Sequence, residues 1–154
     1  MASELIERAQ DFVRRRFENE YSGHDYFHTL RVFKMATRIA ESEGADVETV
    51  QLAALLHDVD DRKISPETYE GQANARGFLL SVGIDGEPAN LICGIIREIS
   101  FGTNDAAPST LEGRCVQEPT ALMPSVQLGL PVRLPTAATV TGTCTTPTSR
   151  RSPT

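Results

Sequence analysis

The sequence predicts an all-α fold for residues 1–118, followed by a disordered C-terminal tail. Within residues 1–118, apolar side chains recur at steps of three and four, which is the period of a helix with one buried face. No stretch alternates convincingly between polar and apolar residues, as a half-buried strand would. Helix-capping residues and glycines separate the apolar stretches. These observations together indicate one helical domain without internal repeats.

The first two helices are predicted over residues 3–20 and 26–43. Asp25 supplies an N-cap for the second, because a side-chain oxygen there accepts a hydrogen bond from a free backbone amide. Gly44 ends it, since glycine readily adopts the left-handed conformation that closes many helices. The apolar stripes are Leu5, Ala9, Phe12, Val13 and Phe17 in the first helix, and Phe27, Leu30, Phe33, Ala36, Ile39 and Ala40 in the second.

The third predicted helix should lie at the centre of the domain. Asp46 caps its beginning. The run from Leu52 to Leu56 is apolar on nearly every side, as is typical of a helix surrounded by other elements. A polar loop is expected to follow over residues 60–65.

Three further helices complete the prediction. The residues Ser65-Pro66-Glu67 indicate the start of a fourth helix, because proline is favoured at the first helical position. This helix is expected to continue to about Ser81. Pro88 opens a fifth helix with an Ile-rich stripe, and a sixth is expected to begin within residues 110–117.

Charge and composition change at about residue 119. Residues 1–118 hold 12 basic and all 21 acidic residues, a net charge of −9, whereas residues 119–154 hold three arginines and no acidic residue. The second segment also contains nine threonines, six of the nine prolines and no aromatic residue, so it has too little apolar surface to offset its ordering entropy. We therefore divide the chain into a domain at 1–118 and a disordered tail at 119–154.

Composition also bears on partners and location. The net charge of −6 argues against a nucleic-acid groove as the main surface. No stretch approaches the roughly 18 consecutive apolar residues of a membrane span, and no signal peptide is visible. The three cysteines (Cys93, Cys115 and Cys144) are widely spaced and odd in number, which fits a reducing cytoplasm better than a disulfide framework. We expect Cys93 to be a small core residue.

His28, His57 and Asp58 are the candidate metal ligands. His28 lies one turn into the second predicted helix, and the adjacent pair His57-Asp58 ends the third. Two imidazoles and a carboxylate suit a divalent ion such as Mn, Fe, Co, Ni or Zn, with Mg as a further possibility. On spacing alone a simpler interpretation is favoured, a half-buried histidine and an ordinary helix end, since His24-Asp25 is a second His-Asp pair in the same chain.

Four ordered segments resemble the HD-domain superfamily of metal-dependent phosphohydrolases, in particular a small stand-alone branch. They are SGHDYFHTLRV at 22–32, LAALLHDVDD at 52–61, IIREISF at 95–101 and TLEGR at 110–114. The resemblance covers about residues 5–118 and implies an HD-type helical bundle that hydrolyses a phosphate ester or anhydride with a divalent metal ion. It also implies that His28, His57 and Asp58 are the first three metal ligands.

Three other polar residues are candidates for the same site. Asp61 resembles an acidic residue that some family members place near the attacking water, although a solvated loop acid is an equally good interpretation. Arg31 lies one turn beyond His28 and is a candidate ligand of a substrate phosphate, with a salt bridge to a nearby acid such as Asp58 as the alternative. Lys63 is a further phosphate candidate or a simple loop charge.

The resemblance breaks after Gln117. In this branch an Asp-Ala-Asp-Arg segment follows, and its second Asp is the fourth ligand, whereas this chain has Gln117-Glu118-Pro119-Thr120. Thr120 stands in the ligand's place, and a neutral hydroxyl substitutes poorly for a carboxylate. We hypothesise a frameshift, because loss of the T from CAG GAT GCC GAC leaves codons for the four residues found. Sequencing codons 117–120 tests this, and absence of the Asp-Ala-Asp-Arg frame would contradict it.

The sequence thus predicts an incomplete phosphohydrolase domain with weakened metal binding and low stability. Its expected partner is a small phosphorylated substrate, such as a nucleotide or another phosphorylated metabolite, and neither nucleic acid nor a membrane. The alternative is a non-catalytic HD-fold module that binds a ligand or partner, or an inactive gene remnant.

Overall fold

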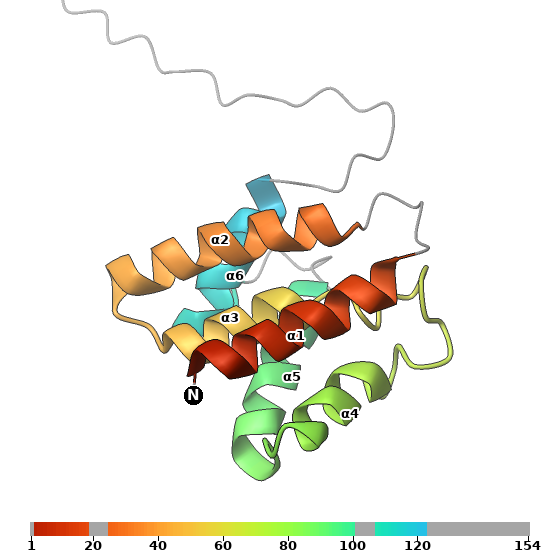
Figure 1. Ribbon diagram of the computed structural model, residues 1–154. Coiled ribbons are helices and arrows are strands. Elements are labelled where there is room, and N and C mark those ends of the chain that lie inside the picture. The colour runs from red at the N-terminus through yellow and green to blue at the C-terminus, as the bar shows by residue number, and fades with distance from the viewer. Residues whose placement is uncertain (1, 19–24, 101–106, 123–154) are drawn as a thin grey trace, which may run out of the picture.

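The computed structural model describes residues 2–18, 25–100 and 107–122. In these ranges the chain forms six helices and no strands, which confirms the all-α prediction. None of these helices is long and apolar enough to cross a membrane. In chain order they are α1 (Ala2–Phe17), α2 (Tyr26–Glu43), α3 (Val47–Leu56), α4 (Ala73–Ser81), α5 (Gly86–Ser100) and α6 (Leu111–Leu122) (Figure 1).

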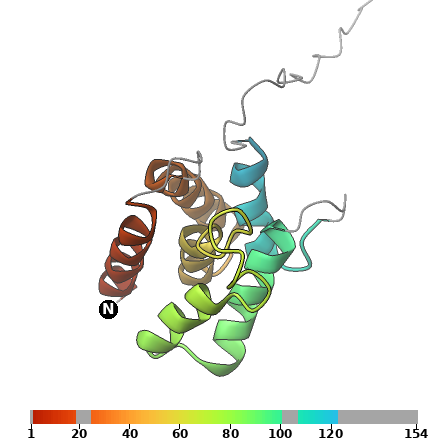
Figure 2. The ribbon, with the colours of Figure 1, turned by 90° about the vertical axis from the view of Figure 1, so that its right-hand side faces the viewer.

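Helix α3 lies at the centre of the domain, as its composition predicts. It contacts α1, α2, α5 and α6, and Figure 2 shows it between α1 on one side and α5 and α6 on the other. Every residue from Leu52 to Asp60 is buried. Each fully buried aliphatic side chain contributes roughly 1.5–3 kcal/mol to stability, so this short helix organises the core.

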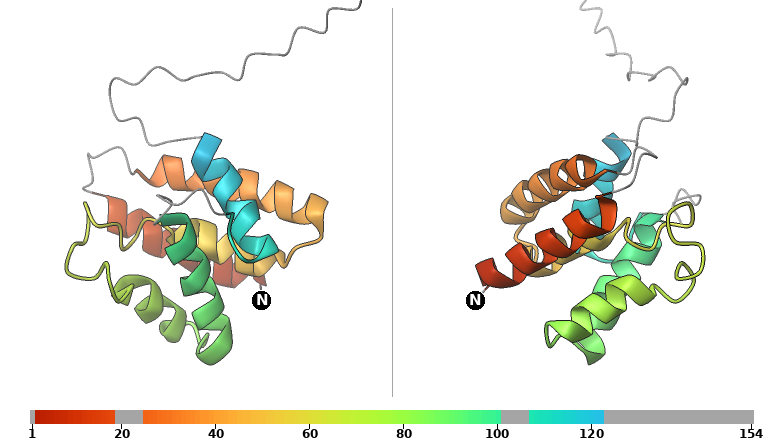
Figure 3. Two further views of the ribbon diagram at one scale, coloured as in Figure 1. Left: turned by 180° about the vertical axis from the view of Figure 1, so that it is seen from behind. Right: turned by 45° about the vertical axis from the view of Figure 1, so that its right-hand side comes forward.

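Helices α1 and α6 cover opposite sides of α2 and α3. Figure 1 shows α1 in front of α3, and the view from behind in Figure 3 shows α6 lying across α2. Helix α6 contacts α2, α3 and α5. On the lower side of the domain α4 contacts α5, and the rings of Phe12 on α1 and Phe78 on α4 stack with centroids 4.9 Å apart.

The predicted caps of α2 and α3 are confirmed. A carboxylate oxygen of Asp25 accepts a hydrogen bond from the backbone amide of His28 at 2.6 Å. Gly44 follows α2 with a φ of 72°, in the left-handed region where glycine is favoured. Asp46 caps α3 by accepting a bond from the amide of Glu48 at 3.1 Å. Local sequence therefore determines where these two helices begin.

The predicted start of the fourth helix is wrong. The carbonyl of Ser65 accepts the bonds of only a single turn, residues 66–72 form turns, and α4 begins at Ala73. Gln72 has a φ of 49°, a left-handed conformation that interrupts a helix. In addition, the carboxylate of Asp60 binds amides just beyond that interruption. A tertiary contact therefore overrides the local start signal at Pro66.

Other helix ends differ from the prediction by a few residues. Helix α1 ends at Phe17 rather than near residue 20. Helix α5 begins at Gly86, so Pro88 lies within its first turn, where amides have no helical partner and a missing N–H costs little. Cys93 is 2% exposed, which confirms its assignment to the core.

Helix α6 continues past the predicted boundary between domain and tail. The boundary at 118/119 falls inside this helix, which includes Pro119 and ends at Leu122. The part of the predicted disordered tail over residues 123–154 lies outside the described residues. Residues 119–122 are thus helical rather than part of a tail.

Candidate metal centre

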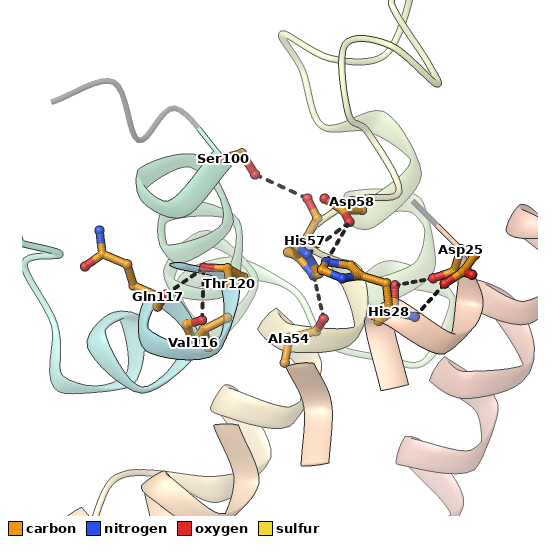
Figure 4. A network of polar contacts seen from close by, with 10 residues as sticks. Asp25, His28, Ala54, His57, Asp58, Ser100, Val116, Gln117 and Thr120 are labelled. Atoms are coloured by element: carbon orange, nitrogen blue, oxygen red, sulfur yellow. Dashed lines mark hydrogen bonds and ion pairs between the residues drawn. The ribbon is translucent and has the colours of Figure 1, made fainter. Parts of the chain in front are cut away.

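His28 is held in the first turn of α2 by the cap that begins the helix. Because Asp25 accepts a hydrogen bond from the backbone amide of His28, the backbone carrying this imidazole is fixed in the first turn of α2 (Figure 4). The side chain is buried, with only 5% of the residue exposed. A buried imidazole needs polar partners, and those come from the end of α3.

His57 and Asp58 lie at the C-terminal end of α3. His57 keeps a helical backbone conformation as the C-cap, and its Nδ1 lies 2.7 Å from the carbonyl oxygen of Ala54. A carbonyl can only accept, so Nδ1 carries the proton and donates. The opposite nitrogen, Nε2, then presents its lone pair toward Asp58 when the ring is neutral. A second partner of this kind is what orients histidine ligands of metal ions.

The three candidate ligands converge on one small buried volume. The Nε2 atoms of His28 and His57 lie 3.9 and 3.1 Å from Oδ2 of Asp58. One ligand atom from each residue lies within 4.8 Å of the others, and the two rings are 5.8 Å apart between centroids. His57 and Asp58 are only 6% and 7% exposed.

The three ligand atoms could bind a single ion if the distances between them, which reach up to 4.8 Å, shortened slightly. Two atoms that each bind one ion at about 2.1 Å are at most about 4.2 Å apart. The buried set of two imidazoles and one carboxylate also matches the preference of first-row divalent ions such as Mn, Fe, Co, Ni and Zn. The residues present therefore fit a metal ion.

Electrostatics in this group favour positive charge. Burial lowers the pKa of His57, but the charge and hydrogen bond of Asp58 and the Ala54 carbonyl outweigh it, with a smaller contribution from Asp61. The net result is a pKa raised above the ordinary value of a histidine. The carboxylate of Asp58 therefore favours a positive charge beside it, which is also what a metal site requires.

The other predicted site residues are Asp61, Arg31 and Lys63, and none of them belongs to the buried group of His28, His57 and Asp58. The carboxylate of Asp61 accepts a bond from the amide of Lys63 at 2.8 Å, within its own turn, while its charge still contributes to the raised pKa of His57. The side chains of Arg31 and Lys63 are exposed. Their roles toward a substrate stay predictions.

Asp60 is a residue whose importance the sequence does not reveal. The sequence predicts it in a polar loop, yet it is only 5% exposed and its carboxylate binds the amides of Asn74 and Ala75 at 3.1 and 2.9 Å. Asn74 and Ala75 lie 14 and 15 positions after Asp60, and no local sequence pattern predicts a contact over that separation. The one signal in the sequence is that two further acidic residues, Asp60 and Asp61, follow closely after the His57-Asp58 pair.

Thr120 lies on α6, which packs against the two helices that carry the histidines. Its hydroxyl is directed to its own helix, where it donates to the carbonyl oxygens of Gln117 at 2.8 Å and Val116 at 3.3 Å (Figure 4). Such a hydroxyl is neutral and is already engaged with the backbone. It therefore offers no negative charge to a cation.

Comparison with known proteins identifies the domain. The family model described as HD domain matches residues 25–118. The chain is also 33% identical over 115 residues to the uncharacterized protein YpgQ of Bacillus subtilis (strain 168). That match covers 73% of this chain, and the chain spans about 56% of the length of that relative. No solved structure matches significantly.

Proposed function

Because this chain belongs to the HD-domain family, we propose that it carries a metal-dependent phosphohydrolase site that is impaired at its fourth ligand. The observation that supports the proposal most strongly is the convergence of His28, His57 and Asp58, whose ligand atoms lie within 4.8 Å of one another in a buried group. The resemblance of the surrounding segments supports hydrolysis of a phosphate ester or anhydride in a nucleotide or small phosphorylated metabolite.

Each residue has a distinct role in this proposal. A bound divalent ion would supply Lewis acidity and lower the pKa of a coordinated water. His28, His57 and Asp58 would hold that ion, and the Ala54 carbonyl would orient the His57 ring. Asp61 would orient the attacking water. Arg31 and Lys63, both exposed, would bind the substrate phosphate by charge-assisted hydrogen bonds.

The proposed impairment follows from Thr120. Two imidazoles and a single carboxylate neutralise only one of the two positive charges of a divalent ion. A fourth ligand that is also a carboxylate would neutralise the second and complete the coordination. Thr120 has a neutral hydroxyl hydrogen-bonded within α6, so we expect weak metal binding and slow turnover.

The test combines metal binding with hydrolysis. Purified protein is titrated with Mn²⁺, Co²⁺, Ni²⁺ and Zn²⁺ by calorimetry, and hydrolysis of p-nitrophenyl phosphate and of nucleoside phosphates is followed with each ion. His57→Ala is expected to abolish both, whereas Asp85→Asn, which changes an exposed acid, should change neither. Binding that is unaffected by His57→Ala would contradict the proposal.

Thr120 also supports a second candidate, a non-catalytic HD-fold module or inactive remnant. A site without its fourth carboxylate can keep the fold and lose the chemistry. In that case the protein would bind a ligand or nothing, and no ion would elicit hydrolysis. Metal-free protein that is inactive with all four ions would favour this alternative over an impaired enzyme.

A further inference from the structure

The N-terminus of α4 has no cap of its own. The residue at its N-cap position, Gln72, adopts a left-handed conformation and makes no side-chain capping bond. The first amides of any helix lack intrahelical partners, and buried amides without partners are costly. Ala75 is fully buried, so the amides of this first turn need an acceptor from elsewhere.

Asp60 is that acceptor. One carboxylate oxygen accepts from the amide of Asn74 at 3.1 Å and the other accepts from the amide of Ala75 at 2.9 Å. The carboxylate is buried and lies at the positive end of the helix dipole. A negatively charged acceptor with two amide donors makes stronger bonds than a neutral one. The contact therefore anchors the residues just after the candidate ligands to α4.

Asn74 forms a second set of hydrogen bonds between α4 and the turns that follow Asp58. Its side-chain amide donates to the carbonyl oxygen of Val59 at 3.4 Å and to the hydroxyl of Thr68 at 3.0 Å. Ser65 also donates to Val59, at 3.4 Å. Residues 57–61 are not regular helix, so these side chains determine the path of the backbone immediately after Asp58.

We propose that Asp60 is a positioning residue for the candidate metal group. By binding α4 it fixes the turn at 57–61 in the conformation that directs Asp58 toward His28 and His57. The identification of that group as a metal site rests on the proposed function; the positioning of the turn itself does not. Without the Asp60 contact, Asp58 would sample orientations away from the imidazoles, and metal ligands depend strongly on such supporting contacts.

The test uses Asp60→Asn and a matched control, Asp46→Asn. The side-chain amide introduced by Asp60→Asn would present an N–H₂ group to one of the two helix amides, so one acceptor is lost with little change in size. Asp46 also caps a helix with its carboxylate, but at the end of α3 that is remote from His57. Both variants are checked for folding by circular dichroism and for stability by urea unfolding. Three readouts follow: Co²⁺ affinity, the Co²⁺ absorption spectrum, and amide hydrogen exchange of metal-free protein.

We expect Asp60→Asn to weaken Co²⁺ binding about 10-fold or more and to alter the spectrum, while Asp46→Asn stays within about twofold of the parent. In metal-free Asp60→Asn, the amide of Asp61, which bonds to the carbonyl of Asp58 at 3.1 Å, should exchange faster. Unchanged affinity, spectrum and exchange in a destabilised Asp60→Asn would show that the residue is only a helix cap and overturn the proposal.

The Co²⁺ and hydrogen-exchange measurements distinguish a failure of the proposed metal site from a failure of the proposed role of Asp60. If the parent protein binds no Co²⁺, the metal site is contradicted, and the exchange measurement on metal-free protein still decides whether Asp60 holds the turn. If Asp60→Asn does not fold, Asn74→Ala replaces it, because that change removes the bonds to Val59 and Thr68 and keeps the capped backbone amide. Asn74→Ala is then expected to weaken Co²⁺ binding more than Asp46→Asn does, and an equal effect would contradict the proposal.

Discussion

At the scale of single residues, Asp58 determines the character of the buried group. Its Oδ2 lies 3.1 Å from Nε2 of His57 and 3.9 Å from Nε2 of His28. Its negative charge raises the pKa of His57 against the opposing effect of burial. A carboxylate in this position attracts a proton or a metal ion. Removing its charge should therefore lower both the pKa of His57 and the affinity for a metal ion.

Asp58→Asn is expected to lower metal affinity by more than about 10-fold, because loss of a ligand costs at least as much as loss of a supporting contact. Calorimetric titration with Mn²⁺ or Co²⁺ measures the effect, with Asp85→Asn as the control for an exposed acid. Equal affinities in Asp58→Asn and the parent would exclude Asp58 as a ligand.

Thr120→Asp is expected to strengthen metal binding about 10-fold, equivalent to about 1.4 kcal/mol, because it returns a carboxylate to the position that the family resemblance assigns to the fourth ligand. Thr120→Asn is the control, since it has the same size as aspartate and no charge. The same titration measures both variants. Equal behaviour of the two would indicate that residue 120 does not reach the ion.

Cys93 is expected to be unreactive in the folded protein. Burial raises the pKa of its thiol, with Asp60 adding to the rise and Arg76 and Arg97 opposing it. A raised pKa reduces the thiolate fraction, and the thiolate is the nucleophile. At pH 8, iodoacetamide should label Cys93 far more slowly in native protein than in urea, as peptide mapping would measure. Equal rates would mean that this part of the core opens readily.

At the scale of elements, the turns between α3 and α4 connect the site to the rest of the domain. They contain four candidate site residues, His57, Asp58, Asp61 and Lys63, and the anchor Asp60. They also contain a strained residue, because Gln72 has a φ of 49° and a buried Oε1 atom without a hydrogen-bond partner. Both features of Gln72 oppose folding.

Gln72→Gly is therefore expected to stabilise the protein by about 1 kcal/mol, since glycine adopts positive φ without strain and leaves no unpaired acceptor. Urea unfolding measures the change. Gln51→Gly is the control, because it places glycine inside α3 and should destabilise by about 1 kcal/mol. A destabilised Gln72→Gly would mean that packing of the Gln72 side chain outweighs its strain.

At the scale of the whole molecule, metal binding and folding should be coupled. The candidate ligands come from α2 and from the end of α3, so they lie close together only in the folded domain. A ligand that binds only the folded state stabilises it by about 2.7 kcal/mol at a concentration 100 times its Kd.

Added Co²⁺ or Mn²⁺ should consequently raise the Tm of this protein in a concentration-dependent way, and EDTA should reverse the rise. Differential scanning fluorimetry measures the shift. His28→Ala supplies the control, because it removes a ligand on α2 and should reduce the shift strongly. A metal-induced shift of the same size in His28→Ala would place the bound ion elsewhere.

Much of the fold is predictable because its signals are local. The apolar period of α1, α2 and α5, the caps at Asp25 and Asp46, and the stop at Gly44 depend on residues close together in the chain. The sequence predicts the start of the fourth helix too early, at Ser65, because a distant carboxylate, that of Asp60, overrides a correct local signal. The predicted end of the domain at residue 118 likewise falls inside α6.

The sequence by itself determined the helical class, the central position of α3, and the three residues that could bind a metal ion. These follow from composition, period and an ordered set of motifs, all of which are properties of short segments. Only the tertiary structure decided that His28, His57 and Asp58 meet in one buried group, and that Asp60 anchors the turn after them. Hydrogen bonds between distant segments depend on how the helices pack, and packing is a property of the whole domain.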